Sequence, residues 1–188
     1  MNNTSTQLNL NQRMNLSDYV KVYDNVLTAD NCQHLIKLFE TDVEHQVKHD
    51  REVYNFTEIN TIQAKWDLSF LFQSLMYHKQ RYWADTGLLP QHVSLDHTYE
   101  EFRMKRYMPE KEQFLPHTDC WDGKSMKRFL VFFWYLTTVD VGGETEFYTL
   151  DKPLKVQSVQ GRLVMFPATF QYLHAGLTPI SSPKYIIG

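Results

Sequence analysis

His117 and Asp119 are the residues of this sequence whose types and spacing point most directly to chemistry. Two positions apart on an extended segment, they project to the same face of a strand, because strand side chains alternate with a period of two. An imidazole and a carboxylate can bind one metal ion but leave it under-coordinated. His174 is the best-placed candidate for a third ligand. Two imidazoles and one carboxylate suit non-haem Fe(II) and leave coordination positions open.

A His-x-Asp pair alone is weak, because short motifs recur by chance and a surface histidine beside a turn aspartate looks the same. Three residues strengthen the metal interpretation. His174 follows the expected strand Gly161–Pro167 after a short loop and can return to the same end of the fold. Lys184 stands ten residues beyond His174, where its cation could meet an anionic cosubstrate, although alone it reads as a solvated strand end. Tyr107 precedes His117 by ten residues, and its phenol could hydrogen-bond the same anion.

Two helices and a series of short strands are the elements expected to position these residues. Thr28 is a candidate N-cap for a first helix, and helical spacing predicts a second over Trp66–Asp85. The segment Arg128–Thr138 is almost continuously apolar and therefore predicts a central strand covered on both faces. The other predicted strands are Val53–Ile62, Tyr99–Tyr107, Glu144–Tyr148, Val156–Val159, Arg162–Phe166, Tyr172–Gly176 and Lys184–Ile187. About eight short strands after the helices favour an antiparallel sandwich or barrel backed by helices.

Length and composition favour one folded domain. The chain has 188 residues, 43% of them hydrophobic, so we expect a polar flexible tail over residues 1–15 and a single domain over residues 16–188. A net charge of −3 offers no electrostatic case for nucleic acid or an anionic membrane. The longest apolar run, Phe129–Leu136, is too short to span a bilayer, and no secretory signal is visible. Two cysteines are too few for a disulfide framework, so a reducing compartment, the cytoplasm, is expected.

The ordered set of motifs resembles a known family. Its pieces are Tyr107, His117-x-Asp119, Arg128, the run from Tyr135 through Gly142-Gly143 to Thr145 and Phe147, Gly161–Pro167, His174-Ala-Gly and Lys184. In this order they resemble the Fe(II)/2-oxoglutarate-dependent dioxygenase superfamily, most closely the prolyl 4-hydroxylase catalytic domain. The resemblance covers roughly residues 20–188, and the ordered set is specific although each piece alone is not.

The resemblance implies a mainly β, α+β fold: a double-stranded β-helix (jelly-roll, cupin-like) core with N-terminal helices packed on one side. It implies Fe(II) and 2-oxoglutarate as cofactors and raises ascorbate as a further one. The implied roles are iron ligation by His117, Asp119 and His174, pairing with the distal carboxylate of 2-oxoglutarate by Lys184, hydrogen bonds to that cosubstrate from Tyr107 and Thr145, and a position near the peptide groove for Arg128.

The activity implied by the resemblance is hydroxylation of an amino-acid residue, foremost prolyl 4-hydroxylation in a Pro-containing protein or peptide, with neither nucleic acid nor membrane as a partner. One alternative keeps the chemistry but acts on a free amino acid or small metabolite. Another is a catalytically silent metal-binding interaction module, which the presence of His117, Asp119 and Lys184 disfavours. A Zn(II) hydrolase is weaker still, because no His-Glu-x-x-His segment accompanies the ligands. The chain ends soon after Lys184, so a clipped closing strand is expected.

Overall fold

The computed structural model describes residues 15–89, 91–93, 96–149 and 152–188. The flexible tail predicted over residues 1–15 therefore lies outside the described residues, apart from Asn15. The Asn15 backbone N–H donates to Asp18 Oδ2 at 2.9 Å and begins a short 3₁₀ helix.

The described residues contain two α-helices, three 3₁₀ turns and eleven strands. The helices are α1 (Ala29–Thr41) and α2 (Ser69–Thr86), and the 3₁₀ turns are η1 (Leu16–Tyr19), η2 (Val43–His45) and η3 (Phe170–Tyr172). Three strands precede α2: β1 (Lys21–Tyr23), β2 (Val47–Asp50) and β3 (Tyr54–Asn60). The strands after α2 are β4 (Arg103–Tyr107), β5 (Gln113–His117), β6 (Leu130–Tyr135), β7 (Thr145–Phe147), β8 (Leu154–Val156), β9 (Leu163–Pro167), β10 (His174–Gly176) and β11 (Lys184–Ile187).

Several predicted boundaries are correct and others are wrong. Thr28 caps α1 as predicted, because its Oγ1 accepts from the Asn31 N–H at 3.1 Å. The strand predicted at Val156–Val159 instead ends at Val156. The one predicted at Tyr172–Gly176 begins only at His174, because η3 occupies the residues before it. Strand β2 was not predicted, since its sequence Val-Lys-His-Asp is mostly polar and its side chains are largely exposed.

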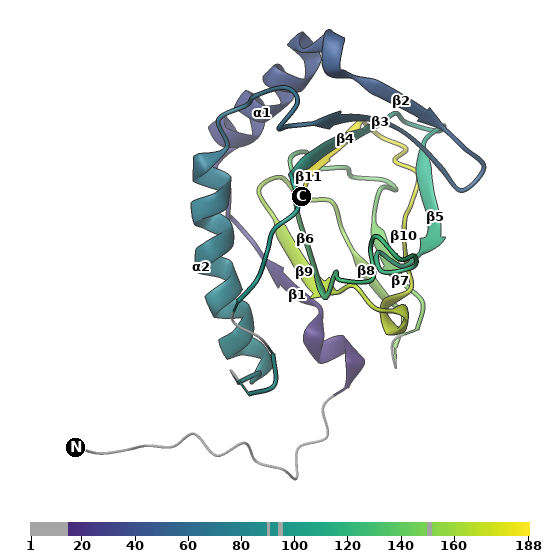
Figure 1. Ribbon diagram of the computed structural model, residues 1–188. Coiled ribbons are helices and arrows are strands. Elements are labelled where there is room, and N and C mark those ends of the chain that lie inside the picture. The colour runs from purple at the N-terminus through teal and green to yellow at the C-terminus, as the bar shows by residue number, and fades with distance from the viewer. Residues whose placement is uncertain (1–14, 90, 94–95, 150–151) are drawn as a thin grey trace.

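The strands form one antiparallel sheet that curls into a barrel. The strand order is β1-β9-β6-β11-β4-β3-β5-β10-β7-β8, with β2 added on the outer side of β3. Figure 1 shows the strands wrapping around a central space, with α1 and α2 both on one side of it. This arrangement is the double-stranded β-helix, or jelly roll, that the sequence predicted, with the N-terminal helices on one side.

Strand β6 explains how the barrel and the helices share a core. Its side chains alternate: Trp134 packs outward with the helices, whereas Phe133 and Tyr135 point inward. Strand β9 repeats the pattern, with Leu163 and Met165 outward and Val164 and Phe166 inward. Such strands need apolar residues on both faces, so the near-continuous apolar run was correctly read as central.

A glycine joins the first helix to the barrel. Gly161 has φ +78°, and a Cβ there would lie 2.3 Å from the Leu27 carbonyl oxygen. The Gly161 carbonyl accepts from the backbone N–H groups of Val26 and Leu27 at 2.8 and 3.1 Å. Only glycine combines this backbone conformation with so close an approach.

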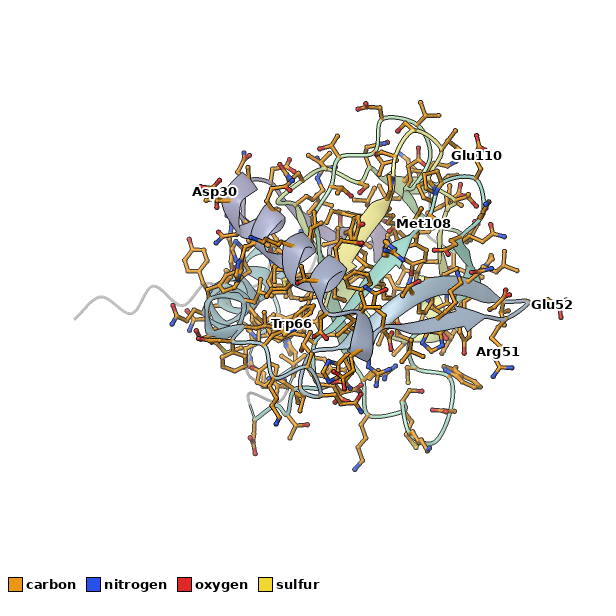
Figure 2. The ribbon with its side chains drawn as sticks, turned by 90° about the horizontal axis from the view of Figure 1, so that it is seen from above. Asp30, Arg51, Glu52, Trp66, Met108 and Glu110 are labelled. Atoms are coloured by element: carbon orange, nitrogen blue, oxygen red, sulfur yellow. The ribbon has the colours of Figure 1, made fainter. Side chains whose placement is uncertain are left out.

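The opposite side of the barrel carries the β2–β3 hairpin. Figure 2 shows its tip, Arg51 and Glu52, projecting away from the body, on the side remote from Asp30 at the start of α1.

Of the helices that the structure describes, none is both long enough and apolar enough to cross a lipid bilayer.

Candidate active site

Strands β5 and β10 bring the two histidines together from positions 57 residues apart in sequence. The strands pair antiparallel, and His174 lies directly opposite His117. Asp119 follows two residues after His117, just beyond the end of β5. One ligand atom of each of the three side chains lies within 4.8 Å of the other two. The convergence expected from the sequence is therefore present, while the metal-ligand roles themselves stay a prediction.

Both imidazoles are held with one nitrogen free to bind a cation. His117 Nδ1 lies 2.8 Å from the Leu115 carbonyl oxygen, and His174 Nδ1 lies 3.0 Å from the Tyr172 carbonyl oxygen. A carbonyl only accepts, so Nδ1 must carry the proton and Nε2 keeps its lone pair. Backbone carbonyls commonly orient metal-binding histidines in this way.

The third side chain has a buried oxygen without a partner. Asp119 Oδ2 has no hydrogen-bond partner among the described residues and lies 3.5 Å from His174 Nε2. Its backbone carbonyl accepts from Arg128 Nη1 at 3.1 Å, which helps to fix the residue. An unpaired buried carboxylate oxygen is costly unless a cation compensates it. Together with two free Nε2 atoms, it forms a donor set that fits Fe(II).

Aromatic rings surround the triad and keep both histidines neutral. The Phe114 ring stacks on His117, with ring centroids 3.5 Å apart and planes 9° apart. Phe147 and Phe166 lie against His174, at centroid distances of 5.6 and 4.8 Å. Burial, with the nearby His174, lowers the pKa of His117 to about 4, and burial likewise lowers the pKa of His174. Neutral imidazoles are the form that binds metals.

Lys184 stands in the same cavity as the triad. The cavity holds about 640 Å³, and its lining includes both histidines, Asp119 and Lys184. Lys184 is 1% exposed, and in the described part of the chain its ammonium forms no ion pair. Burial lowers its pKa to about 7, with the carboxylate of Glu144 opposing the shift. A buried ammonium in this position provides an anion-binding end for the cavity.

Tyr107 and Thr145, the other two predicted cosubstrate residues, line the cavity beside Lys184. Tyr107 pairs with Lys184 across β4 and β11, and the Lys184 ammonium lies 5.4 Å from its ring centroid. Burial raises the pKa of Tyr107, so its phenol remains a donor. Thr145 Oγ1 accepts from the Tyr135 hydroxyl at 2.7 Å, which leaves the threonine's own hydroxyl hydrogen free.

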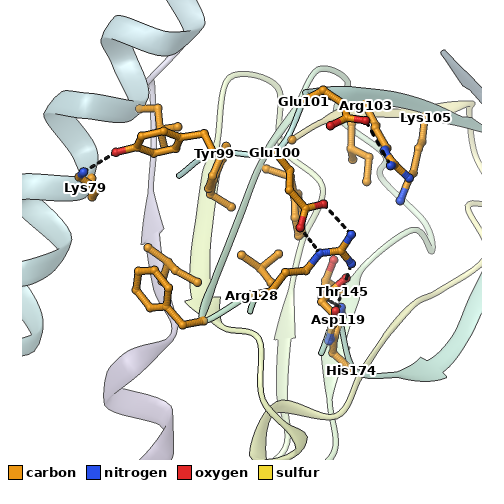
Figure 3. A pocket seen from close by; sticks show the side chains of 18 of the residues that line it. Lys79, Tyr99, Glu100, Glu101, Arg103, Lys105, Asp119, Arg128, Thr145 and His174 are labelled. Carbon is orange, nitrogen blue, oxygen red and sulfur yellow. Dashed lines mark hydrogen bonds and ion pairs between the residues drawn. The ribbon is translucent and has the colours of Figure 1, made fainter. Parts of the chain in front are cut away.

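Arg128, the predicted substrate-side residue, lies at the cavity wall and is engaged by Glu100. Its Nε and Nη2 each donate to a Glu100 carboxylate oxygen at 2.6 Å. Figure 3 shows this two-point contact beside Asp119, and a second contact between Lys79 and Tyr99 further along the same segment. Residues 96–101 are thereby fastened along the cavity, and Arg128 links them to Asp119.

Sequence reasoning missed three residues of this site. Tyr135, which orients Thr145, was read only as part of a motif. Glu100 had no sequence signal, because it lies in an irregular segment 28 residues before Arg128. Lys105 also lines the cavity, and a signal for it existed: it lies two residues before Tyr107 on β4 and therefore on the same face.

Comparison with known proteins agrees with this geometry. Residues 102–188 match the family model described as "2OG-Fe(II) oxygenase superfamily". The resemblance to the 2OG-Fe(II) oxygenases is confirmed. The matched residues include every predicted ligand and cosubstrate residue, and the matched family is one of Fe(II)- and 2-oxoglutarate-using oxygenases. No curated protein was significantly similar to the chain in sequence.

Solved structures with the same fold include several prolyl hydroxylases. The viral collagen prolyl hydroxylase of Paramecium bursaria Chlorella virus-1, in its 2-oxoglutarate complex, is 20% identical, with 90% of this chain and 93% of that chain covered at a TM-score of 0.65. A Pseudomonas putida prolyl-4-hydroxylase is 16% identical, covering 90% and 89% at 0.66. A Trichoplax adhaerens prolyl hydroxylase, in complex with a hypoxia inducible factor peptide fragment, is 13% identical, covering 91% and 82% at 0.68. At these identities the likeness establishes the fold.

Proposed function

We propose that this chain is an Fe(II)- and 2-oxoglutarate-dependent dioxygenase that hydroxylates an amino-acid residue, foremost a prolyl residue in a protein or peptide. One observation carries the proposal: the triad His117, Asp119 and His174 shares a cavity with the buried ammonium of Lys184, which has no ion-pair partner among the described residues. A metal at the triad and an anion at Lys184 are the two anchors that a chelating dicarboxylate needs.

In this proposal Nε2 of both histidines and the Asp119 carboxylate hold Fe(II). Lys184, with hydrogen bonds from Tyr107 and Thr145, binds the far carboxylate of 2-oxoglutarate in a poorly solvated pocket, where charge-assisted hydrogen bonds are strong. Bound iron and 2-oxoglutarate supply the oxygen chemistry, and ascorbate is the proposed reductant that keeps the iron ferrous. The protein supplies orientation and the exclusion of water. We propose the cytoplasm as its location, because ferrous iron needs a reducing compartment.

The prolyl part of the proposal is supported by the motif resemblance and by the fold shared with prolyl hydroxylases. The Trichoplax enzyme, in complex with its peptide, provides the parallel for a peptide substrate. Arg128 and Glu100 lie on the wall that a peptide entering this cavity would meet.

The test is 2-oxoglutarate turnover by the purified protein. Fe(II), 2-oxoglutarate and O₂ should yield succinate, Pro-containing peptides should raise the rate, and mass spectrometry should show one added oxygen on proline. An anaerobic sample and Asp119→Ala serve as controls without turnover. Succinate formation stimulated only by free amino acids would move the substrate to the small-metabolite class. No succinate under any condition, from metal-loaded protein, would leave a binding module and contradict the enzyme proposal.

A further inference from the structure

A second lysine, Lys105, is partly buried and lines the same cavity as the triad and Lys184. Lys105 faces inward on β4 between Arg103 and Tyr107. Because Tyr107 pairs with Lys184, Lys105 lies one inward-facing position, about 7 Å, further along the strand. Figure 3 shows its side chain beside Arg103.

The surroundings of Lys105 leave its ammonium incompletely paired. It makes no hydrogen bond within the described ranges, and its nearest carboxylate oxygen, Glu58 Oε2, is 3.9 Å away. Glu58 is not held by Lys105 alone, since Arg103 Nη1 lies equally far from its other oxygen and His49 Nε2 lies 3.8 Å from that same oxygen. The remaining neighbours are the rings of Phe56 and Phe114, with centroids 5.0 and 5.7 Å from the ammonium.

Three other cations that line the cavity are already engaged. Arg128 is bound at two points by Glu100, Arg103 lies 3.6 Å from a Glu101 oxygen, and Lys79 donates to Tyr99. Lys105 is different: its side chain is 24% exposed, and it lies close enough to Asp119 to interact with it electrostatically. An ammonium with spare donors, in a partly apolar cavity beside the triad, favours an anionic group of a bound molecule.

We propose that Lys105 is a carboxylate-binding residue beside the His117–Asp119–His174 triad. The inference rests on the proposed function, because it assigns this residue to the same cavity. The carboxylate has two possible sources, the keto-acid end of 2-oxoglutarate or an acidic group of the molecule that is hydroxylated. Lys105 thus either adds a second anchor for the cosubstrate or selects for an acidic substrate.

The cosubstrate arm measures binding without turnover. Anaerobic Fe(II)-loaded protein is titrated by calorimetry with 2-oxoglutarate and with 2-oxobutanoate, which keeps the keto-acid end but lacks the far carboxylate. If Lys105 binds the keto-acid end, Lys105→Met weakens both ligands about tenfold or more, and Lys105→Arg restores most of the affinity. Lys184→Met should weaken 2-oxoglutarate alone.

The substrate arm measures succinate formation with matched pairs: Pro-containing peptides that differ only by Asp or Asn beside the proline, and free proline against prolinamide. If Lys105 binds a substrate carboxylate, wild type prefers the acidic member of a pair about tenfold or more. Lys105→Met then loses that preference while 2-oxobutanoate binding stays unchanged.

Controls separate these outcomes from structural damage. Lys37→Met removes an exposed positive charge on α1 and should change neither readout. Metal affinity and the melting temperature of each variant report on folding, and Lys105→Gln is a second variant if Lys105→Met is unstable.

The inference is overturned if Lys105→Met binds both keto acids like wild type and no pair reveals an acidic preference that depends on Lys105. Failure of wild type to bind 2-oxoglutarate at all would instead count against the proposed function.

Discussion

Asp119 lowers the stability of the metal-free fold, and it provides a ligand atom for the proposed metal site. Its carboxylate oxygen Oδ2 is buried without a hydrogen-bond partner among the described residues, beside two imidazoles whose lowered pKa values keep them neutral. Uncompensated burial of this kind costs about 1–3 kcal/mol. A divalent cation at the triad would turn that cost into binding energy.

We expect Asp119→Ala to lose specific Fe(II) binding while the metal-free protein keeps its fold. Its metal-free stability should equal wild type or exceed it by about 1 kcal/mol, because the unpaired oxygen is gone. Metal titration and thermal unfolding in chelator check both parts. The matched control is Asp140→Ala, which removes an exposed carboxylate that does not line the cavity. Wild-type metal affinity in Asp119→Ala would remove this residue from the ligand set.

Lys184 is a buried cationic side chain, and its burial also costs folding free energy when no anion is bound. Burial lowers its pKa to about 7, against about 10.4 in an unfolded chain, so the unfolded chain binds more protons between these values. Stability therefore rises with pH through this window, because the folded protein is relieved of a buried charge. The groups facing its ammonium are Tyr107, Tyr135 and the carboxylate of Glu144.

Lys184→Met should accordingly be more stable than wild type when no cosubstrate is bound. The advantage should be largest below pH 7 and should shrink by about 2 kcal/mol between pH 7 and pH 9. Denaturant unfolding of both proteins across that range measures it. The same variant should bind 2-oxoglutarate at least tenfold more weakly. A pH-independent difference in stability would mean that Lys184 is not buried as a charge.

At the scale of elements, the site depends on pairing between strands that are distant in sequence. His117 ends β5 and His174 begins β10, and their antiparallel register sets the two imidazoles side by side. Strands β4 and β11 similarly set Tyr107 opposite Lys184. The helices stay outside and support the outer face of β6 and β9, with Gly161 fastening the start of α1 to the barrel.

Gly161→Ala tests this fastening. The added Cβ would meet the Leu27 carbonyl oxygen in a backbone conformation that L-residues avoid, so we expect a loss of about 2–4 kcal/mol in unfolding free energy. Gly123→Ala is the matched control, because a Cβ there meets no atom within 4 Å. Urea unfolding compares the two. Equal stabilities would show that the connection before α1 moves aside without cost.

At the scale of the whole molecule, the barrel encloses a cavity that all the proposed binding residues line. Lys184, Tyr107 and Thr145 line it together with the triad, and Arg128 with Glu100 lies on the wall beside Asp119. Two ligands that bind only the folded state should therefore stabilise it in a fixed order, metal before cosubstrate.

We expect 2-oxoglutarate at about a hundred times its dissociation constant to raise the melting temperature by about 5–10 °C, but only when metal is present. Chelator should abolish this second shift completely, and Lys184→Met should reduce it to about half or less at the same 2-oxoglutarate concentration while keeping the shift caused by metal. Differential scanning fluorimetry with anaerobic Fe(II) makes the measurement. A cosubstrate shift of the same size without metal would contradict chelation at the triad.

Much of this architecture was determined by sequence alone. Strand patterning predicted an antiparallel sandwich or barrel, the apolar run predicted a central strand at β6, and the family resemblance implied the jelly roll. Helical spacing, with Thr28 as a cap, predicted the helices. The ordered residues His117, Asp119, His174 and Lys184 pointed to the chemistry, because two imidazoles and a carboxylate suit Fe(II) and the ordered set resembles the Fe(II)/2-oxoglutarate dioxygenases.

The contacts that depend on strand register and on irregular segments were determined only by the tertiary structure. That His174 lies opposite His117 follows from long-range pairing, which no local pattern encodes. The contact of Glu100 with Arg128 joins two irregular segments 28 residues apart in sequence. The partial pairing of Lys105 depends on the distance to Glu58 on the neighbouring strand β3. Local sequence sets which face a side chain occupies, whereas its partners are set by the distances that folding creates.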